Sequence, residues 1–389
     1  FHGLDPDVFV DNHVSNGADY QYTLTYISSL NNRMPDAIRK ITNESLLPDL
    51  EIDLHDNYGI DLFPYVDLKG RTPEEGIVSF NDLPRYSMGY TALFQALSFT
   101  VETHMLKPFP KRVQATLAFM KSLISWTAQH KNLIEKSRVK ARKSIATSKT
   151  FSFDYDSDGF CDSILFKGYA HSFPKHHITG LERLKYDTLA PYERNIAHYK
   201  SFKPKKKVRV PKYYFVGRQE KDVIKRLKAN KVIMNKLEND TIMQLGVFEV
   251  SDYQVSKYPY EGHFKLNNVK VKLGERLVSL KAGDVRIPSN QQNASFIHSV
   301  LQPEAEDSYL TWNFFDSYLQ QKEYFSSYVF IDKIEEILNN DPVLRAEYES
   351  KIAKDKDFRE SEWSQLYFIY KRSPYFEKSV NVLPVFFMY

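Results

Sequence analysis

The chain has 389 residues, of which 42% are hydrophobic and 14% aromatic, and its formal net charge is +4. This composition excludes a disordered or fibrous protein, and the length predicts two or three domains rather than one. Because Lys and Arg alternate with Asp and Glu along most of the chain, there is no electrostatic case for nucleic-acid binding. The single cysteine, Cys161, excludes disulfides within the chain. No apolar run is long enough to cross a bilayer, so we expect no transmembrane segment.

The first predicted element is a strand over Asp7–Asp11, which is nearly continuous in apolar character and is followed by polar Asn12 and His13. In open α/β sheets, ligands bind beyond the carboxyl ends of the strands. A histidine at such a position therefore has more functional weight than one in the middle of a helix.

The rest of the first 147 residues predicts alternating helices and strands. Helical periodicity runs from about residue 26 to 40, and a polar stretch rich in Asp and Asn follows to about residue 76. Three further elements close this part: a helix over 87–95, a strand over 97–102 that ends on a carboxylate, and a long amphipathic helix over 111–143.

Beyond residue 148, short β-prone runs are separated by Gly, Pro and Asn, with one short helix at 221–228; the runs are 150–155, 163–168, 212–216, 244–250 and 267–273. From Gln291 onward the pattern is mainly helical, with Asp341-Pro342 as a helix start and Ser373-Pro374 as a stop. We therefore predict an α/β protein in three parts: a mixed sheet flanked by helices (1–147), a β-rich domain (148–290) and a mainly helical C-terminal region (291–389).

Two predicted strand ends carry side chains suited to hydrolysis, His13 and Glu102. A neutral imidazole is a common zinc ligand, and a carboxylate facing a metal-bound water is the usual base in metal-assisted hydrolysis. Spacing alone does not show that the two ends meet. The alternative is a capping histidine and a surface glutamate.

Two runs of sequence carry a family resemblance. The run DVFVDNHVSNGADYQY at 7–22 resembles the strand that delivers the third zinc ligand in the funnelin-type zinc carboxypeptidases, which implies that His13 is this ligand. The run FTVETHML at 99–106 is similar to the last catalytic strand of that family, which implies that Glu102 is the general base. Further downstream, three segments resemble a C-terminal region of large bacterial members: 302–309, 312–316 and 369–377.

The resemblance also points to a substrate loop. In this family a tyrosine on a loop before the catalytic glutamate closes over the substrate, and Arg85, Tyr86 and Tyr90 occupy that neighbourhood. Each is a candidate substrate contact. The alternative is that Ser87 caps a helix between aromatic residues that only pack.

The chain also departs from the family pattern. The other two zinc ligands of the family come from a His-x-x-Glu pair upstream of the third ligand, and this sequence contains no His-x-x-Glu. Two explanations stand: the chain is a fragment whose missing N-terminal part completes the catalytic domain, or it is a non-catalytic relative. We favour the fragment, because a sheet without its first strands leaves a long unpaired edge.

The resemblance therefore implies a zinc metallocarboxypeptidase that acts on peptides outside the cytoplasm, in the periplasm or secreted. Two alternatives remain: a non-catalytic protein that binds peptides or glycans, and a zinc amidase that cuts the stem peptides of peptidoglycan. A separate run, Asp154, Asp156 and Asp158, copies the first half of a calcium loop, but Leu165 stands where the closing glutamate belongs. An Asp-rich turn is the other interpretation of this run.

Overall fold

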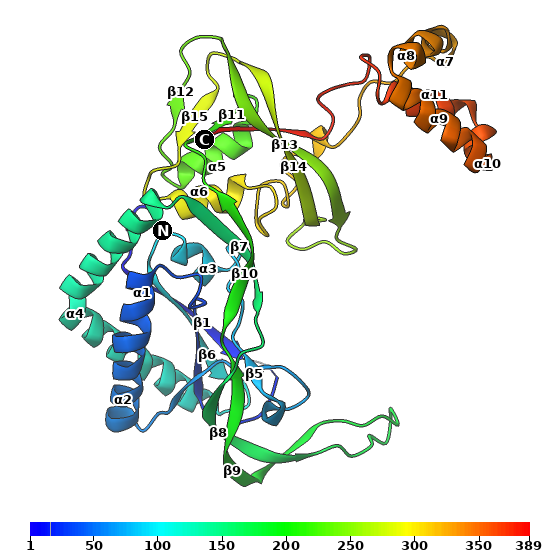
Figure 1. Ribbon diagram of the computed structural model, residues 1–389. Helices are drawn as coiled ribbons and strands as arrows, with labels where there is room; N and C mark the ends of the chain where they lie inside the picture. The colour runs from blue at the N-terminus through cyan, green and yellow to red at the C-terminus, as the bar shows by residue number, and fades with distance from the viewer. Residues whose placement is uncertain (16) are drawn as a thin grey trace.

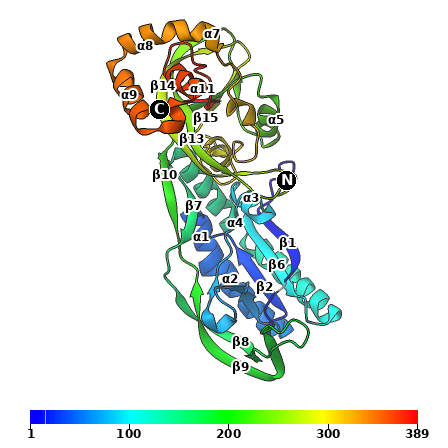
Figure 2. The same ribbon diagram turned by 90° about the vertical axis from the view of Figure 1, so that its right-hand side faces the viewer.

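A computed structural model describes residues 1–15 and 17–389. Figure 1 shows an α/β part at the bottom, a second sheet with its own helices above it, and a small group of helices at the upper right. Two antiparallel strands, β7 (Thr150–Ser157) and β10 (Phe202–Arg209), run between the lower and upper parts in both views (Figures 1 and 2). The α/β fold class predicted from the sequence is confirmed.

The lower part is built on a four-stranded mixed sheet in the order β1-β6-β2-β3. Its strands are β1 (Val8–Ser15), β6 (Leu97–His104), β2 (Leu24–Ser28) and β3 (Leu62–Pro64). β1 runs parallel to β6, whereas β6 and β2 are antiparallel. β1 is therefore an edge strand, and no strand in the described part of the chain pairs with its outer side.

Helices cover one face of this sheet. They are α1 (Asp36–Ile41), a π-helical turn at Thr42–Leu46, α2 (Leu47–Tyr58) and the long α4 (Phe109–Thr147). On β6, Leu97, Phe99 and Val101 are almost fully buried in the same core as Phe119 and Trp126 of α4. Because side chains alternate along a strand, Glu102 points to the opposite face, which these helices leave free.

The helix predicted over residues 26–40 is wrong. Residues 24–28 form β2, which lies between β6 and β3 in the sheet, and α1 begins only after Pro35. Thr25 and Ile27 are β-branched and suit a central strand, and proline cannot continue a helix through its own position. The stretch expected to be polar and irregular contains α2, whose Leu47, Leu50 and Leu54 are buried at helical spacing.

The strands between residues 148 and 290 divide among three sheets. β8 (Asp162–Ser172) and β9 (Lys185–Tyr199) form a long hairpin that pairs with β5 (Ile77–Val78), next to β4 (Asp67–Leu68). β7 and β10 form a two-stranded sheet of their own. The domain boundaries at 147 and 290 stay a prediction.

The upper part is a six-stranded antiparallel sheet in the order β12-β15-β11-β16-β13-β14. The strands are β12 (Asn235–Lys236), β15 (Val285–Pro288), β11 (Tyr213–Val216), β16 (Val382–Met388), β13 (Thr241–Val255) and β14 (Leu266–Leu280). Helices α5 (Lys221–Ala229) and α6 (Ala294–Leu301) share its core. β16 was not predicted from the sequence; it returns from the C-terminal region to a central place in this sheet.

The remaining helices form a small cluster with a core of its own, which includes Phe330, Leu338 and Ile369. They are α7 (Ser327–Phe330), α8 (Ile334–Asn340), α9 (Pro342–Lys354), α10 (Lys356–Arg359) and α11 (Glu362–Tyr370). The predicted start of α9 is confirmed, because the Asp341 side chain accepts a hydrogen bond from the Leu344 amide as an N-cap. Within residues 1–15 and 17–389, no helix has the length and apolarity that crossing a membrane requires.

Candidate functional site

The pairing of β1 with β6 brings His13 and Glu102 side by side. The two strands are parallel, and their register places His13 opposite Glu102 and Asp11 opposite Thr100. The Nδ1 atom of His13 lies 3.9 Å from Oε1 of Glu102. The two residues singled out in the sequence, 89 positions apart, thus share one face of the sheet.

The strand that carries His13 is longer than predicted. β1 continues through Ser15 instead of ending at Asp11. His13 therefore lies on the strand itself, with its side chain 51% exposed. The imidazole is accessible from solvent, while the neighbouring carboxylate is not.

The surroundings of the Glu102 carboxylate change its pKa. The residue is only 8% exposed, and its Oε2 atom has no hydrogen-bond partner within the part of the chain that the structure describes. Burial raises the pKa of Glu102, and the nearby Asp11 carboxylate acts in the same direction while His13 opposes it. A carboxylate whose pKa is raised toward neutrality is suited to accept a proton during hydrolysis.

The Glu102 carboxylate also affects the pKa of Tyr65, a residue that was not predicted for the site. Burial raises the pKa of Tyr65 to about 12, and the Glu102 carboxylate contributes to this shift. Tyr65 follows β3 in the chain, far from both runs that carried the family resemblance. Only the pairing of β3 with β2 brings it near, so no local signal could have identified it.

Asp11 and Ser87 extend the site toward helix α3 (Ser87–Ala92). The Asp11 Oδ2 atom lies 3.1 Å from Nε2 of His13 and also accepts a hydrogen bond from the Ser87 hydroxyl. This hydrogen bond, together with His13, holds the pKa of Asp11 below its ordinary value despite partial burial. Asp11 was not among the residues predicted for the site, although its position two residues before His13 on a strand predicts that both face the same way.

The two runs that follow His13 and Glu102 also meet. The Asp19 carboxylate lies 3.2 Å from Nε2 of His104 and 3.5 Å from the Lys107 ammonium group. His104 is 2% exposed, and burial lowers its pKa to about 4. This imidazole is therefore neutral near pH 7, and its contact with Asp19 joins the two runs.

The three candidate substrate contacts have different surroundings. The Arg85 guanidinium is held by the Asp307 carboxylate, at 2.9 Å, and by the Glu306 carbonyl, at 3.2 Å. The Tyr90 hydroxyl donates to Oδ1 of Asn230 at 2.6 Å. Tyr86, in contrast, is 37% exposed, and its ring packs edge-on against Phe80. The exposed Tyr86 side chain is thus the one that a bound molecule can reach most directly.

The residues present do not complete a metal site. In residues 1–15 and 17–389, no three His, Cys, Asp or Glu side chains are grouped so that they could hold a metal ion. His13 supplies one imidazole, and tetrahedral zinc sites need at least three protein ligands. In the Asp-rich run, Asp156 pairs with Lys205 at 2.9 Å, and Asp158 accepts from Ser201 at 2.8 Å.

The backbone around Ser87 leaves no room for a side chain at position 89. A Cβ atom on Gly89 would overlap the carbonyl oxygens of Leu83 and Asp82. We therefore expect Gly89→Ala to displace the start of α3 and to lower the free energy of unfolding by about 1–3 kcal/mol, the usual cost of overpacking. Urea unfolding measures this difference. Gly3→Ala is the matched control, because a Cβ there meets nothing within 4 Å; equal costs for the two variants would contradict the prediction.

Comparison with known proteins adds a partial similarity. No protein-family model matches the chain, and no solved structure matches it. Carboxypeptidase 2 of Trichophyton tonsurans and of Trichophyton equinum are each 30% identical to it over 102 residues, and Carboxypeptidase 2 of Trichophyton rubrum is 29% identical. The match covers 26% of this chain, which spans about a fifth (19%) of the length of these curated relatives. The chain contains a carboxypeptidase-like region.

Proposed function

We propose that this chain is the later part of a zinc-dependent metallocarboxypeptidase, which hydrolyses C-terminal peptide bonds of peptides through a zinc-activated water. The observation that carries the proposal is the placement of His13, a candidate zinc ligand, 3.9 Å from the buried carboxylate of Glu102, a candidate general base. The similarity to Carboxypeptidase 2 supports the peptidase reading. Location outside the cytoplasm rests on the family resemblance alone.

In this proposal the other zinc ligands come from a segment outside these 389 residues. His13 alone does not fit a zinc ion, so zinc binding would depend on ligands from that segment. Within the described residues no strand pairs with the outer side of β1, and this supports the proposal because the free side of an eight-residue edge strand is a template for pairing with another strand. A segment paired there would lie directly beside His13.

The first test is metal content and activity of the protein purified from its native source. We expect a mass well above 45.5 kDa, about one zinc per chain, and hydrolysis of N-blocked peptides that is lost on chelation and restored by zinc. The recombinant 389-residue chain is the control and is expected to hold no stoichiometric zinc. Native protein without zinc and without hydrolysis would instead favour a non-catalytic binding protein.

A further inference from the structure

A cavity of about 250 Å³ lies where the α/β part meets the upper part of the molecule. Its floor is apolar: Leu93, Phe296 and Val300 are each less than 10% exposed. Tyr260 and Trp312 stand at its side, and Tyr260 is 40% exposed. The volume is below the ~300–1,000 Å³ typical of sites for whole ligands, so it suits a single bulky side chain.

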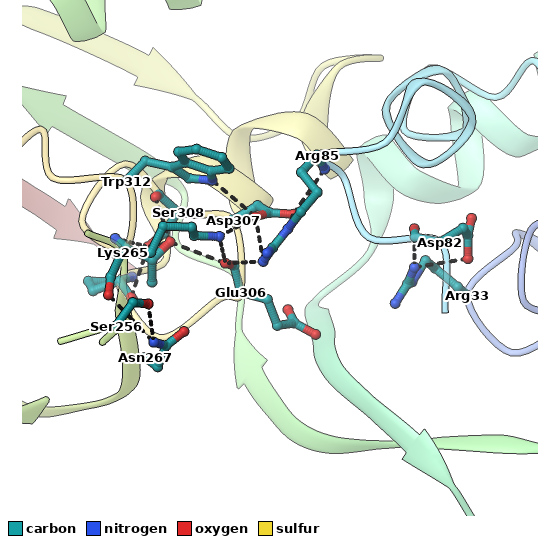
Figure 3. Close-up of polar contacts among 12 residues, drawn as sticks. Arg33, Asp82, Arg85, Ser256, Lys265, Asn267, Glu306, Asp307, Ser308 and Trp312 are labelled. Carbon is teal, nitrogen blue, oxygen red and sulfur yellow. Dashed lines mark hydrogen bonds and ion pairs between the residues drawn. The ribbon is translucent and has the colours of Figure 1, made fainter. Parts of the chain in front are cut away.

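One buried carboxylate fixes the wall of this cavity. Figure 3 shows side chains from three segments converging on Asp307. Its oxygens accept from the Arg85 amide at 2.9 Å, from the Lys265 ammonium at 3.0 Å and from the Trp312 indole at 3.0 Å. The Arg85 guanidinium adds two further contacts, at 2.9 and 3.2 Å. With five contacts on one carboxylate, Arg85 and Trp312 are held in place before any ligand arrives.

The same short segment of chain reaches both the cavity and the candidate site. Pro84 and Arg85 line the cavity. Two residues further on, Ser87 donates its hydroxyl hydrogen bond to Asp11, which contacts His13. Two residues span at most about 7 Å between their Cα atoms, so a peptide a few residues long can reach from one place to the other.

We propose that this cavity is a subsite for an aromatic or bulky apolar side chain of the peptide substrate, upstream of the bond that is cut. The inference rests on the proposed function for the identity of the substrate. A carboxypeptidase leaves one residue beyond the cut bond, and that residue must adjoin Glu102. Contacts lead from the segment that lines the cavity to Glu102 through Ser87, Asp11 and His13, so we assign to the cavity a residue on the other side of the bond.

Three charged residues also line the cavity: Arg85, Asp307 and Glu261. The Arg85 guanidinium pairs with Asp307, which it shares with Lys265, and the centre of that guanidinium lies 5.7 Å from the Tyr260 ring and 5.9 Å from the Trp312 ring. The Asp307 oxygens are already occupied by Arg85, Lys265 and Trp312, so an occupant of the cavity need not pair with them. An aromatic ring can contact the apolar floor and the exposed face of Tyr260 without disturbing these contacts.

The test uses the native protein and N-blocked alanine peptides that end in its preferred C-terminal residue, with Phe placed at each upstream position in turn. We expect one position at which Phe raises kcat/KM roughly 10–100-fold over Ala, the range that a hydrophobic pocket discriminates. Tyr260→Ala is expected to remove this preference. Tyr258→Ala, on the same loop but 71% exposed and outside the cavity lining, is expected to keep it.

The outcomes separate this inference from the proposed function. Hydrolysis without any preference for Phe, or with a preference that survives in Tyr260→Ala, would overturn the subsite and leave the peptidase proposal standing. If no peptide is hydrolysed, calorimetric titration with the same peptides decides: tighter binding of one Phe peptide that depends on Tyr260 supports the subsite. Equal binding of all peptides would overturn it.

Discussion

Glu102→Gln in the complete protein is expected to lower kcat for peptide hydrolysis by about 10²–10⁴-fold, the contribution of a positioned general base. Glutamine has nearly the shape of glutamate but cannot accept a proton, so the fold and the metal content should be unchanged. Steady-state hydrolysis of a blocked peptide and zinc analysis measure the two effects. Glu51→Gln, on the helical side of the sheet, is the control and should hydrolyse at the wild-type rate. A Glu102→Gln enzyme with wild-type kcat would remove Glu102 from the chemistry.

The environment of Glu102 also sets the expected pH dependence. Burial raises the pKa of this carboxyl in the folded protein. A general base must be deprotonated, so activity is lost as the pH falls through this raised pKa. The acidic limb of the kcat/KM profile should therefore lie above the ordinary range of a glutamate, and it should be absent from the residual activity of Glu102→Gln.

The elements that were predicted correctly are those whose signal is local. α4 shows helical periodicity over many turns, and β6 begins with a short apolar run and continues two residues beyond its predicted end at Glu102, so neither depends on distant residues. The expectation that His13 and Glu102 serve one site came from resemblance and from the tendency of strand ends to meet. The register that pairs them is a tertiary feature and could not be read from spacing.

The features that were missed are tertiary. β2 was mistaken for a helix because its five residues, read with those that follow, also fit a helical period; its burial between β6 and β3 decides the conformation. The contacts of Asp307 with Lys265 and Arg85 bridge 42 and 222 residues, and no local pattern marks such partners. The proposed subsite and the contacts of Asp307 that fix its wall are therefore visible only in the folded chain.

Asp307→Ala is expected to lower the free energy of unfolding by about 3–5 kcal/mol, because it leaves buried cations without a counter-charge. The side chains of Asp307 and Lys265 are only 4% and 3% exposed. Although burial acts to raise it, Lys265 and Arg85 hold the pKa of Asp307 below its ordinary value. Urea unfolding followed by tryptophan fluorescence measures the loss. Asp252→Ala, which removes an exposed pair with Lys270, is the control and should cost at most about 1 kcal/mol.

Asp307 has two cationic neighbours, Arg85 and Lys265, and this excess of positive charge allows a sharper test than Asp307→Ala alone. Burial lowers the pKa of Lys265, and the neighbouring Arg85 acts in the same direction while Asp307 opposes both. Lys265→Met removes the surplus charge and leaves the Arg85–Asp307 pair intact, whereas Asp307→Ala leaves two cations facing each other. Lys265→Met should therefore cost far less than Asp307→Ala. Equal costs would mean that packing, and not charge balance, holds Arg85 and the chain leading to Ser87 against the upper sheet.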